Sequence, residues 1–365
     1  MNGLQVRDSR DLEQFINISR YAGERFDLVQ AGGGNSSLKC ADGTMLIKAS
    51  GCSLSEVDAA HGYTTVHLSK VLAILEDPEV ISASDKKRQE AIAALRLQES
   101  LSSSENRPSI ETYLHALLAR CTLHTHPIAV NAVAGREDWE SILGGLIPEA
   151  LFVPYETPGL RLALLLKDAI ARNSDESARK PMIVFLQNHG LIVSGDEPET
   201  VKSETERIVL ALESYLGISL NAYKLTTTIS TMLGEISAAH PIVYRSTDAE
   251  LLRLVADLPW KKLARPFCPD GLVYTGAEPV MLDDPSSAQA VSQYYAAYGE
   301  LPKVLMYRGQ VFCVAPNVRK AKEIEEVFKF HAMVVAMAGV DIQPLAEAEL
   351  AYLGNWEAEK YRQQR

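Results

Sequence analysis

The sequence predicts an α/β protein in two parts, a larger one over residues 1–225 and a smaller α/β part over residues 226–365. Two observations favour this fold class. Segments whose apolar residues recur at helical spacing alternate along the chain with short apolar or alternating runs that end in glycine, which are typical of strands. The length of 365 residues also favours two hydrophobic cores over one.

The first elements follow from local patterns. Residues 9–24 are predicted as a helix because Leu12, Phe15 and Ile16 fall on one stripe. The next residues, RFDLVQ, are expected to form a short strand that leads into the glycine-rich stretch AGGGNSSLK. The segment TMLIKASG alternates and ends in glycine, so it is expected to complete a hairpin.

The remaining elements of the first part are expected in the same way. Strands are predicted at the sequence LHTHP and, as a pair joined near Asn188, within PMIVFLQNHGLIVSGD. Pro198 suits the first turn of a long helix. The predicted helices cover residues 66–77, 85–101, 109–121, 160–172 and 197–216.

The second part echoes the first. The segment PKVLMYRGQVFCVAPNVRKAKEIEEVF, like the one that contains QNHGLIVSGD, reads as strand, tight turn, strand and helix. In this alignment Gly309 matches Gly190 and Arg308 matches His189. One interpretation is a degenerate, metal-free repeat of the first part. The alternative is that any two strand–turn–strand–helix units look alike.

Composition excludes several classes of protein. Hydrophobic residues make up 47% and charged residues 23%, which is ordinary for a soluble globular chain. The net charge of −11 argues against nucleic acid or an anionic membrane as a partner. No apolar run is long enough for a membrane helix, and the N-terminus has no signal-peptide core. Five scattered cysteines fit single thiols in a reducing cytoplasm.

Two histidines one residue apart suggest a metal site. In a strand, alternate side chains leave the same face, so His124 and His126 would stand side by side. Catalytic zinc sites typically use three protein ligands, and His189, followed by Gly190 on a predicted turn, is the best third candidate. The alternative is a pair of hydrogen-bonded histidines near the end of a sheet.

Glu111 is the candidate catalytic carboxylate. It lies near a predicted helix start, thirteen residues before His124 (124 − 111), and a helix that turns back onto the HTH strand could bring it to the metal. A metal with a nearby carboxylate makes a proton-transfer site. The alternative is a glutamate favoured by the helix dipole. His115, four residues further on, is expected to pack or to orient another group.

The glycine-rich loop suggests a phosphate site. Backbone N–H groups of such turns cradle anions, and Asn35 adds side-chain donors while Lys39 and Lys48 add positive charge. Further donors are the Ser50–Gly51 pair and Ser109 at a helix start, where amides point toward an anion. A dinucleotide loop is disfavoured because the third glycine of its motif and the following helix are missing.

Five motifs in order, GGGNSSLK, LIKASG, PSIETYLHALL, LHTHP and QNHGLIVSGD, resemble the class II aldolase/adducin family. This resemblance implies α/β/α layers around a mainly antiparallel sheet. It also implies zinc, or another divalent metal, on His124, His126 and His189, with Glu111 as the acid/base. It further implies that substrate phosphate binds near the following residues: Gly34, Asn35, Ser50, Gly51 and Ser109.

The second half carries a weaker resemblance. FCPDGLVYTG and the ending NWEAEKYRQQR are similar to the region after the aldolase part of bifunctional rhamnulose-phosphate aldolase/dehydrogenase proteins. Because the sequence stops before a dehydrogenase domain, no nicotinamide is expected.

Ile110 stands where many members of the family carry a second phosphate-binding serine or threonine. Tyr352 and Tyr361 are candidates for the catalytic tyrosine that a neighbouring subunit supplies in this family.

The resemblance implies a zinc-dependent lyase that cleaves a sugar or ketose phosphate by a retro-aldol reaction through a metal-stabilised enediolate. A cytoplasmic homo-oligomer acting on a small sugar or sugar phosphate is expected. Two alternatives within the family are a sugar-phosphate 4-epimerase and a dehydratase. An alternative of another class is an adducin-like scaffold without catalysis, against which the three histidines and Glu111 speak.

Overall fold

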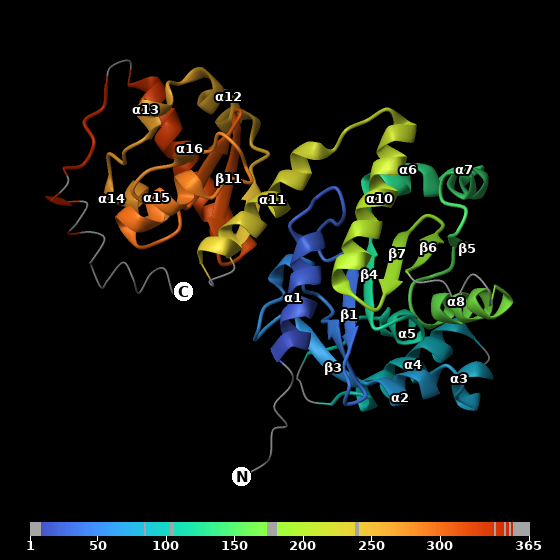
Figure 1. Ribbon diagram of the computed structural model, residues 1–365. Helices are drawn as coiled ribbons and strands as arrows, with labels where there is room; N and C mark the ends of the chain where they lie inside the picture. Colours follow the sequence, from blue (N-terminus) through green and yellow to red (C-terminus); the bar gives the residue numbers. More distant parts are fainter. Residues whose placement is uncertain are drawn as a thin grey trace, which may run out of the picture. The chain divides into compact units, whose positions relative to one another are not determined.

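The chain forms two compact units, residues 1–220 and residues 221–365 (Figure 1). The computed structural model describes residues 9–83, 85–102, 106–173, 181–237, 241–338, 341–346, 348–349 and 352. The units divide just before helix α11 (Asn221–Ile236), whereas the boundary expected from the sequence, after residue 225, falls inside that helix. Each unit has its own hydrophobic clusters and its own sheet.

The described strands of the first unit form a seven-stranded, mainly antiparallel sheet in the order β3-β2-β1-β4-β7-β6-β5. Only β5 and β6 pair in parallel. The strands are β1 (Asn35–Lys39), β2 (Thr44–Lys48), β3 (Tyr63–His67), β4 (Cys121–Thr125), β5 (Leu151–Val153), β6 (Met182–Leu186) and β7 (Gly190–Gly195). The helices are α1 (Ser9–Gly23), α2 (Leu68–Ile74), α3 (Pro78–Ile81), α4 (Lys86–Glu99), α5 (Thr112–Leu117), α6 (Ile128–Ala134), α7 (Trp139–Leu146), α8 (Leu160–Arg172) and α10 (Pro198–Leu216), with a short 3-10 turn η1 (Leu54–Glu56).

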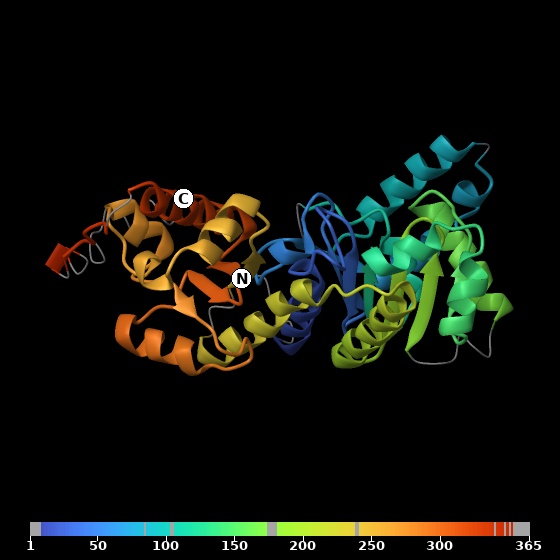
Figure 2. The ribbon, with the colours of Figure 1, turned by 90° about the horizontal axis from the view of Figure 1, so that it is seen from above.

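Helices cover both faces of this sheet, which confirms the expected α/β/α layers. Alternate residues of each strand point to opposite faces. Leu123 and Leu191 pack with α6 and α10 on one face, while Ile192 packs with α5 and α8 on the other. Figure 2 shows α1 and α10 on one side of the sheet and α4 on the other. His124, next to Leu123 in β4, therefore belongs to the face of Ile192.

Three expected elements differ from the structure. The predicted strand over 25–30 is a turn, because the N–H groups of Leu28 and Val29 both donate to the carbonyl of Arg25. The helix predicted from residue 66 is preceded by strand β3, so it begins at Leu68. The helix predicted over 109–121 is confined to α5, because its last residues pair with β1 as the start of β4.

The turn after α1 contains a buried ion pair. Arg25 is 1% exposed, and its Nε donates to Oδ1 of Asp27 at 3.0 Å, with Glu206 of α10 as a second carboxylate partner. Opposite charges at this burial are stable only when both are paired. The same turn also contacts the segment that follows β4, since the carbonyl of Leu28 accepts a hydrogen bond from the N–H group of His126 at 2.8 Å. The ion pair thus fixes the turn that holds the backbone of His126.

The second unit has a smaller sheet of four described strands in the order β8-β11-β10-β9. The strands are β8 (Ile242–Arg245), β9 (Val280–Met281), β10 (Val304–Tyr307) and β11 (Gln310–Ala315). The helices are α11, α12 (Ala249–Asp257), α13 (Trp260–Leu263), α14 (Pro269–Thr275), α15 (Gln289–Tyr298) and α16 (Val318–Met337). Strands β8, β11 and β10 pair antiparallel, and β9 pairs with β10 in parallel.

This sheet has the same order and strand directions as the β4-β7-β6-β5 half of the first sheet. The registers also match. In the first unit His124 pairs with Ile192, which pairs with Val184. In the second unit Arg245 pairs with Phe312, which pairs with Leu305. The row is fixed by the ends of the elements: β7 and β11 both have six residues, and α10 and α16 each begin three residues after them, so Phe312 matches Ile192. Arg245, which pairs with Phe312, therefore occupies the strand position of His124.

The register corrects the alignment expected from the sequence. Counting back along β11 from Phe312, the position of His189 is taken by Gly309, and that of Gly190 by Gln310. The expected match of His189 with Arg308 is thus wrong by one residue. The reason is the turn, which has three residues after β6 but only two after β10. In that two-residue turn both Arg308 and Gly309 have positive φ, as tight hairpins require.

The five cysteines are free thiols, of which Cys121 and Cys313 are buried. Cys40, Cys52 and Cys268 are half-buried rather than fully buried. Among the helices of the described residues, none combines the length and the apolar composition that crossing a membrane requires.

Candidate metal centre

Three histidines from two segments meet at one end of the first sheet. His124 lies in β4, His126 follows it by two residues, and His189 lies in the turn between β6 and β7. Because β4 and β7 are neighbours, this turn is placed beside the end of β4. One nitrogen from each ring lies within 4.8 Å of the others. The arrangement could hold a metal ion, as the spacing of the first two histidines suggested.

The hydrogen bonds of the rings fit a metal site. His124 Nε2 lies 3.1 Å from His126 Nε2 and 3.3 Å from His189 Nε2. On its other side His124 Nδ1 lies 3.1 Å from the carbonyl of Leu191, which can only accept, so Nδ1 carries the proton. The Nε2 atom of His124 then holds a lone pair directed at the other two rings. A backbone carbonyl behind a ligating imidazole is the usual partner that orients it toward a metal.

The surroundings keep all three imidazoles neutral. Burial lowers the pKa of His124 well below its usual value, and the neighbouring imidazoles act in the same direction. Burial also lowers the pKa of His126, and it lowers the pKa of His189 to about 4. Neutral imidazole is the form that binds a metal. The site therefore offers three ligands in the correct protonation state at neutral pH.

Glu111 stands beside this cluster. Its carboxyl oxygen Oε1 lies 3.2 Å from His189 Nε2 and 3.6 Å from His124 Nε2, and the residue is 6% exposed. The other oxygen, Oε2, accepts a hydrogen bond from Nδ2 of Asn35. Oε1 has no hydrogen-bond partner within the described part of the chain. Burial raises the pKa of Glu111 to about 7, although Asn35 and Lys48 act to lower it. A carboxyl with this pKa can both take and give a proton near neutrality.

The structure brings the expected phosphate-binding segments near one another. Asn35 pairs with His124 across β1 and β4. The N–H group of Ser50 donates to the carbonyl of Arg107 at 2.8 Å, which places the Ser50–Gly51 turn next to the segment that leads to Ser109. Lys48 Nζ donates to the carbonyls of Gly32 and Cys52, so it ties the glycine-rich loop to the same turn.

Some expected donors are already engaged. The amide of Asn35 donates to Glu111. Oγ of Ser109 only accepts, from the N–H group of Glu111 at 3.2 Å, so its own O–H can still donate. Lys39 does not reach this region, because its ammonium donates to the carbonyls of Ala116 and Leu118 at the end of α5. The expected contribution of Lys39 to the phosphate site is therefore wrong, whereas Lys48 lies at the loops concerned.

Two further candidates have other positions. His115 is buried, and its Nδ1 lies 2.8 Å from Oγ of Ser37, so it holds α5 against β1. Tyr352 is 63% exposed and forms part of the second unit. Tyr361 and the ending NWEAEKYRQQR lie outside the described residues.

Sequence reasoning missed the backbone groups that orient the ligands. The carbonyls of Leu191 and Leu28 each hold one histidine, the first through its ring and the second through its N–H group. Backbone atoms leave no signal in residue identity. Gly34 is the residue whose identity does give a signal, because glycine is favoured where φ is positive. Its φ is +70° at the bend that leads the loop into β1, and a Cβ there would lie 2.9 Å from the carbonyl of His124.

Gly190 offers a test of how closely β4 and β7 approach. A Cβ at this position would lie 2.3 Å from the carbonyl of Thr125, which is backbone and cannot move aside. Gly190→Ala is expected to lower the free energy of unfolding by about 1–3 kcal/mol, as overpacking does. It should also weaken metal binding about tenfold or more, as loss of supporting groups around a metal does. Chemical denaturation and metal titration measure both effects.

A matched control is Gly145→Ala. A Cβ on Gly145 in α7 would meet no atom within 4 Å, so this variant should bind metal normally and be as stable as the parent or more so. If Gly190→Ala binds metal as tightly as Gly145→Ala, the close approach of β4 and β7 does not shape the site.

Comparison with known proteins identifies the family. The sequence profile described as "Class II Aldolase and Adducin N-terminal domain" matches residues 13–216, which are more than half of the chain. The chain therefore belongs to the class II aldolase and adducin family. This match confirms the resemblance seen in the five motifs, and it covers nearly all of the first unit.

Individual relatives are distant. "Uncharacterized oxidoreductase YuxG" from Bacillus subtilis is 24% identical over 308 residues, which are 75% of this chain and 42% of that protein. The chain thus spans less than half of that relative's length. The N-terminal class II aldolase domain of a conserved protein from Thermoplasma acidophilum is 23% identical, with a TM-score of 0.47, and the match covers 59% of this chain and 98% of that one. The sugar-phosphate aldolase from Thermotoga maritima is 16% identical, with a TM-score of 0.40 and coverages of 57% and 94%. With TM-scores below 0.5, neither structure carries an argument about this chain.

Proposed function

We propose that the protein is a metal-dependent lyase that cleaves a sugar or ketose phosphate by a retro-aldol reaction. The observation that supports this most is the convergence of three neutral imidazoles on one point, next to an oxygen of Glu111 that has no hydrogen-bond partner among the described residues. A metal together with a poised carboxyl suits proton transfer at carbon, because the metal would stabilise negative charge on the substrate and the carboxyl can exchange the proton. An adducin-like scaffold without chemistry would not need either group.

Zinc is the proposed ion, with His124, His126 and His189 as its ligands. Three nitrogen ligands with one position left open are typical of catalytic zinc. When bound, the ion supplies a Lewis acid that stabilises negative charge developing on substrate oxygens. Neutral imidazoles suit this role because they leave the positive charge of the ion intact.

Glu111 is proposed to move the proton at the carbon atom where the bond breaks. Asn35 fixes one carboxyl oxygen through Oε2, so the other oxygen, Oε1, is directed at the histidines. Burial keeps bulk water away from this carboxyl and holds its pKa near 7. The positive charge of Lys48 acts in the opposite direction and lowers the pKa of Glu111.

The phosphate of the substrate is proposed to bind at the loops that Lys48 holds together. Backbone N–H groups of turns attract phosphate, and the ammonium of a lysine adds to this attraction. The donors proposed for this subsite belong to Gly34, Asn35, Ser50, Gly51 and Ser109. The side-chain amide of Asn35 gives one of its two N–H bonds to Glu111, so the other is the group proposed for phosphate.

A metal assay combined with a substrate screen tests the proposal. The purified full chain is loaded with zinc, its metal content is measured, and it is incubated with a panel of ketose 1-phosphates. Release of an aldehyde together with a phosphorylated ketone, only when metal is present, is the expected result. Parallel reactions with added nicotinamide cofactor should show no change in its absorbance.

The products separate this proposal from the other chemistries of the family. A 4-epimerase would convert one pentulose phosphate into another without releasing aldehyde, and a dehydratase would release water and no carbonyl fragment. Consumption of substrate without carbon–carbon cleavage would therefore replace the lyase proposal with one of these. A chain that binds metal but converts no member of a broad panel would favour the scaffold.

A further inference from the structure

A small cavity in the second unit has the character of a binding site. It has a volume of about 190 Å³, and its lining residues come from the end of α14, the start of α16 and the adjoining ends of β10 and β11. Five of its lining residues are apolar or aromatic, and three are charged. They are Val273, Tyr274, Val314, Pro316 and Ile324, with Lys303, Lys320 and Glu323.

Lys303 is the central polar group of this cavity. It stands just before β10, where its carbonyl accepts from the N–H group of Val314 at 2.9 Å. Its ammonium donates to the carbonyl of Val273 at 2.7 Å, which uses one of three N–H bonds. No carboxylate of the described residues forms an ion pair with it, and Glu300 is the acidic group that acts on it from further away. Burial lowers the pKa of Lys303, so the protein itself does not offset its desolvation fully.

The other charged groups leave the cavity positive. Lys320 Nζ lies 2.9 Å from Oε2 of Glu323, and Arg319 Nε lies 3.3 Å from the other oxygen of the same carboxylate. Both oxygens of Glu323 are thus paired with other cations, so Glu323 does not neutralise the charge of Lys303. Among the lining residues Lys320 and Glu323 offset each other, so Lys303 leaves the cavity wall with one net positive charge, which favours an anion.

The fold does not require a lysine at this position. Counting back from the matched rows of the two sheets, Leu305 corresponds to Val184, so Lys303 corresponds to Met182 of the first unit. The first unit therefore has a methionine at the corresponding position, at the start of its inner strand β6. A partly buried ammonium without a carboxylate partner costs free energy, and such groups concentrate at binding sites.

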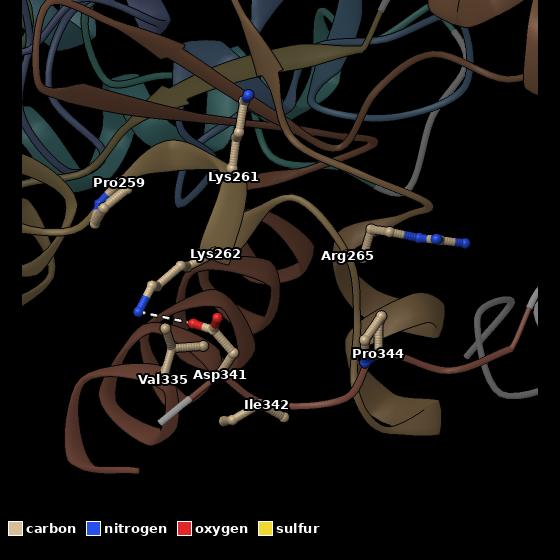
Figure 3. A pocket seen from close by; sticks show the side chains of 8 residues that line it. All are labelled: Pro259, Lys261, Lys262, Arg265, Val335, Asp341, Ile342 and Pro344. Carbon is tan, nitrogen blue, oxygen red and sulfur yellow. Dashed lines mark ion pairs between the residues drawn. The ribbon is translucent and has the colours of Figure 1, made fainter. Parts of the chain in front are cut away.

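A second cavity provides a contrast. It has a volume of about 360 Å³ and is bordered by α13, the end of α16 and residues 341–344. Figure 3 shows that the side chains of Lys261 and Arg265 extend in different directions, while Lys262 is directed at Asp341, with which it forms an ion pair of 2.9 Å. Its three cations do not converge on one point, so they do not mark a site for a single small anion.

We propose that the cavity around Lys303 binds a small aliphatic carboxylic acid. The carboxylate would accept from the ammonium group of Lys303, and the hydrocarbon part would lie against the apolar lining residues, among them Val314 and Ile324. A volume below the roughly 300 Å³ of pockets for drug-sized ligands limits the acid to a few carbon atoms. This site lies within the second unit and is independent of the chemistry proposed for the first.

Binding of 4-methylpentanoate to the zinc-loaded full chain tests the proposal, with 4-methylpentan-1-ol as the probe that lacks only the carboxylate. Chemical-shift titration or calorimetry should show saturable binding of the acid with a dissociation constant of about 1 mM or below. Lys303→Met, which copies the residue of the first unit, should weaken binding of the acid at least about tenfold, because a charged hydrogen bond is lost. Lys261→Met, the same substitution beside the other cavity, should leave binding unchanged.

Three results would overturn the proposal. They are equal binding of the acid and the alcohol, equal binding by Lys303→Met and the parent protein, and absence of saturable binding at about 10 mM acid. The comparison of acid with alcohol uses the unmodified protein, so it does not depend on the folding of Lys303→Met. Repeating it with His189→Ala, which should hold little metal, separates binding at Lys303 from coordination of the acid by zinc, since a carboxylate can ligate zinc. Metal content and lyase activity report on the first unit, and Lys303→Met should retain both, which keeps the two proposals separately testable.

Discussion

Glu111→Gln is expected to lower the turnover number of the lyase reaction by about 10²–10⁴, the usual contribution of a general acid or base. Glutamine keeps the shape of the side chain and can still accept the hydrogen bond from Asn35, so the packing around the site is preserved. An amide cannot take up a proton at Oε1, the atom that faces the histidines. Steady-state kinetics with the substrate found in the screen, together with elemental analysis, measure the effect.

The metal content of Glu111→Gln should equal that of the parent protein, because the three imidazoles are untouched. Glu140→Gln is the matched control, since Glu140 is exposed on α7, and this variant should keep full activity. Full turnover in Glu111→Gln would show that another group moves the proton. Loss of the metal would show instead that the carboxylate is needed to hold the ion.

His189→Ala is expected to weaken metal binding by more than about 100-fold, because loss of a partner behind a ligand already costs 10- to 100-fold. His189 is the best ligand to remove, since it lies in a turn with a partly exposed side chain, whereas His124 is fully buried in the sheet. The parent protein should also gain stability on adding metal, by about 2.7 kcal/mol at a metal concentration of 100 times the dissociation constant. The variant should gain almost none under the same conditions. Competition with a chelating dye and thermal unfolding provide the two measurements.

His61→Ala serves as the control, because the side chain of His61 is 80% exposed and lies outside the cluster. It should bind one metal ion per chain with parental affinity. A stoichiometry of two would contradict the absence of the corresponding ligands among the described residues of the second unit, where Arg245 occupies the position of His124 and Gly309 that of His189, and neither residue can ligate a metal through its side chain. An unaltered metal affinity in His189→Ala would remove the basis of the proposed function.

The metal cluster was predictable because two of its three ligands lie only two residues apart in the sequence. Two histidines at alternate positions of a strand share a face whatever the rest of the fold is. The third ligand could be expected because His189 lies between two strand-like runs, and such runs joined by a short turn pair with each other. Glu111 was harder, since its approach to the cluster depends on how α5 packs against β1 and β4, which its sequence spacing leaves open.

Other expectations failed where long-range contacts decide. The run 25–30 has the composition of a strand, but Arg25 is drawn into an ion pair with Asp27 and Glu206 of a distant helix, and the segment forms a turn. Lys39 carries a positive charge beside the glycine-rich loop in sequence, yet its position at the end of β1 directs it to the carbonyls that end α5. The alignment of the two halves expected from the sequence is wrong by one residue, because the two hairpin turns differ in length. Turn length depends on backbone conformation, such as the positive φ of Asn188 and Arg308, and residue type does not reveal it.

The sequence by itself determined the chemical inventory of this protein: which side chains can bind a metal, which carboxyl can move a proton, and which segments alternate as helices and strands. These properties depend on residue type and on spacing over a few positions. Tertiary structure alone decided which of these groups meet, and that the second unit repeats half of the first sheet without its ligands. Strand register and burial cause this division, because both arise from contacts between residues far apart in the chain, and a shift of one residue moves every side chain to the other face.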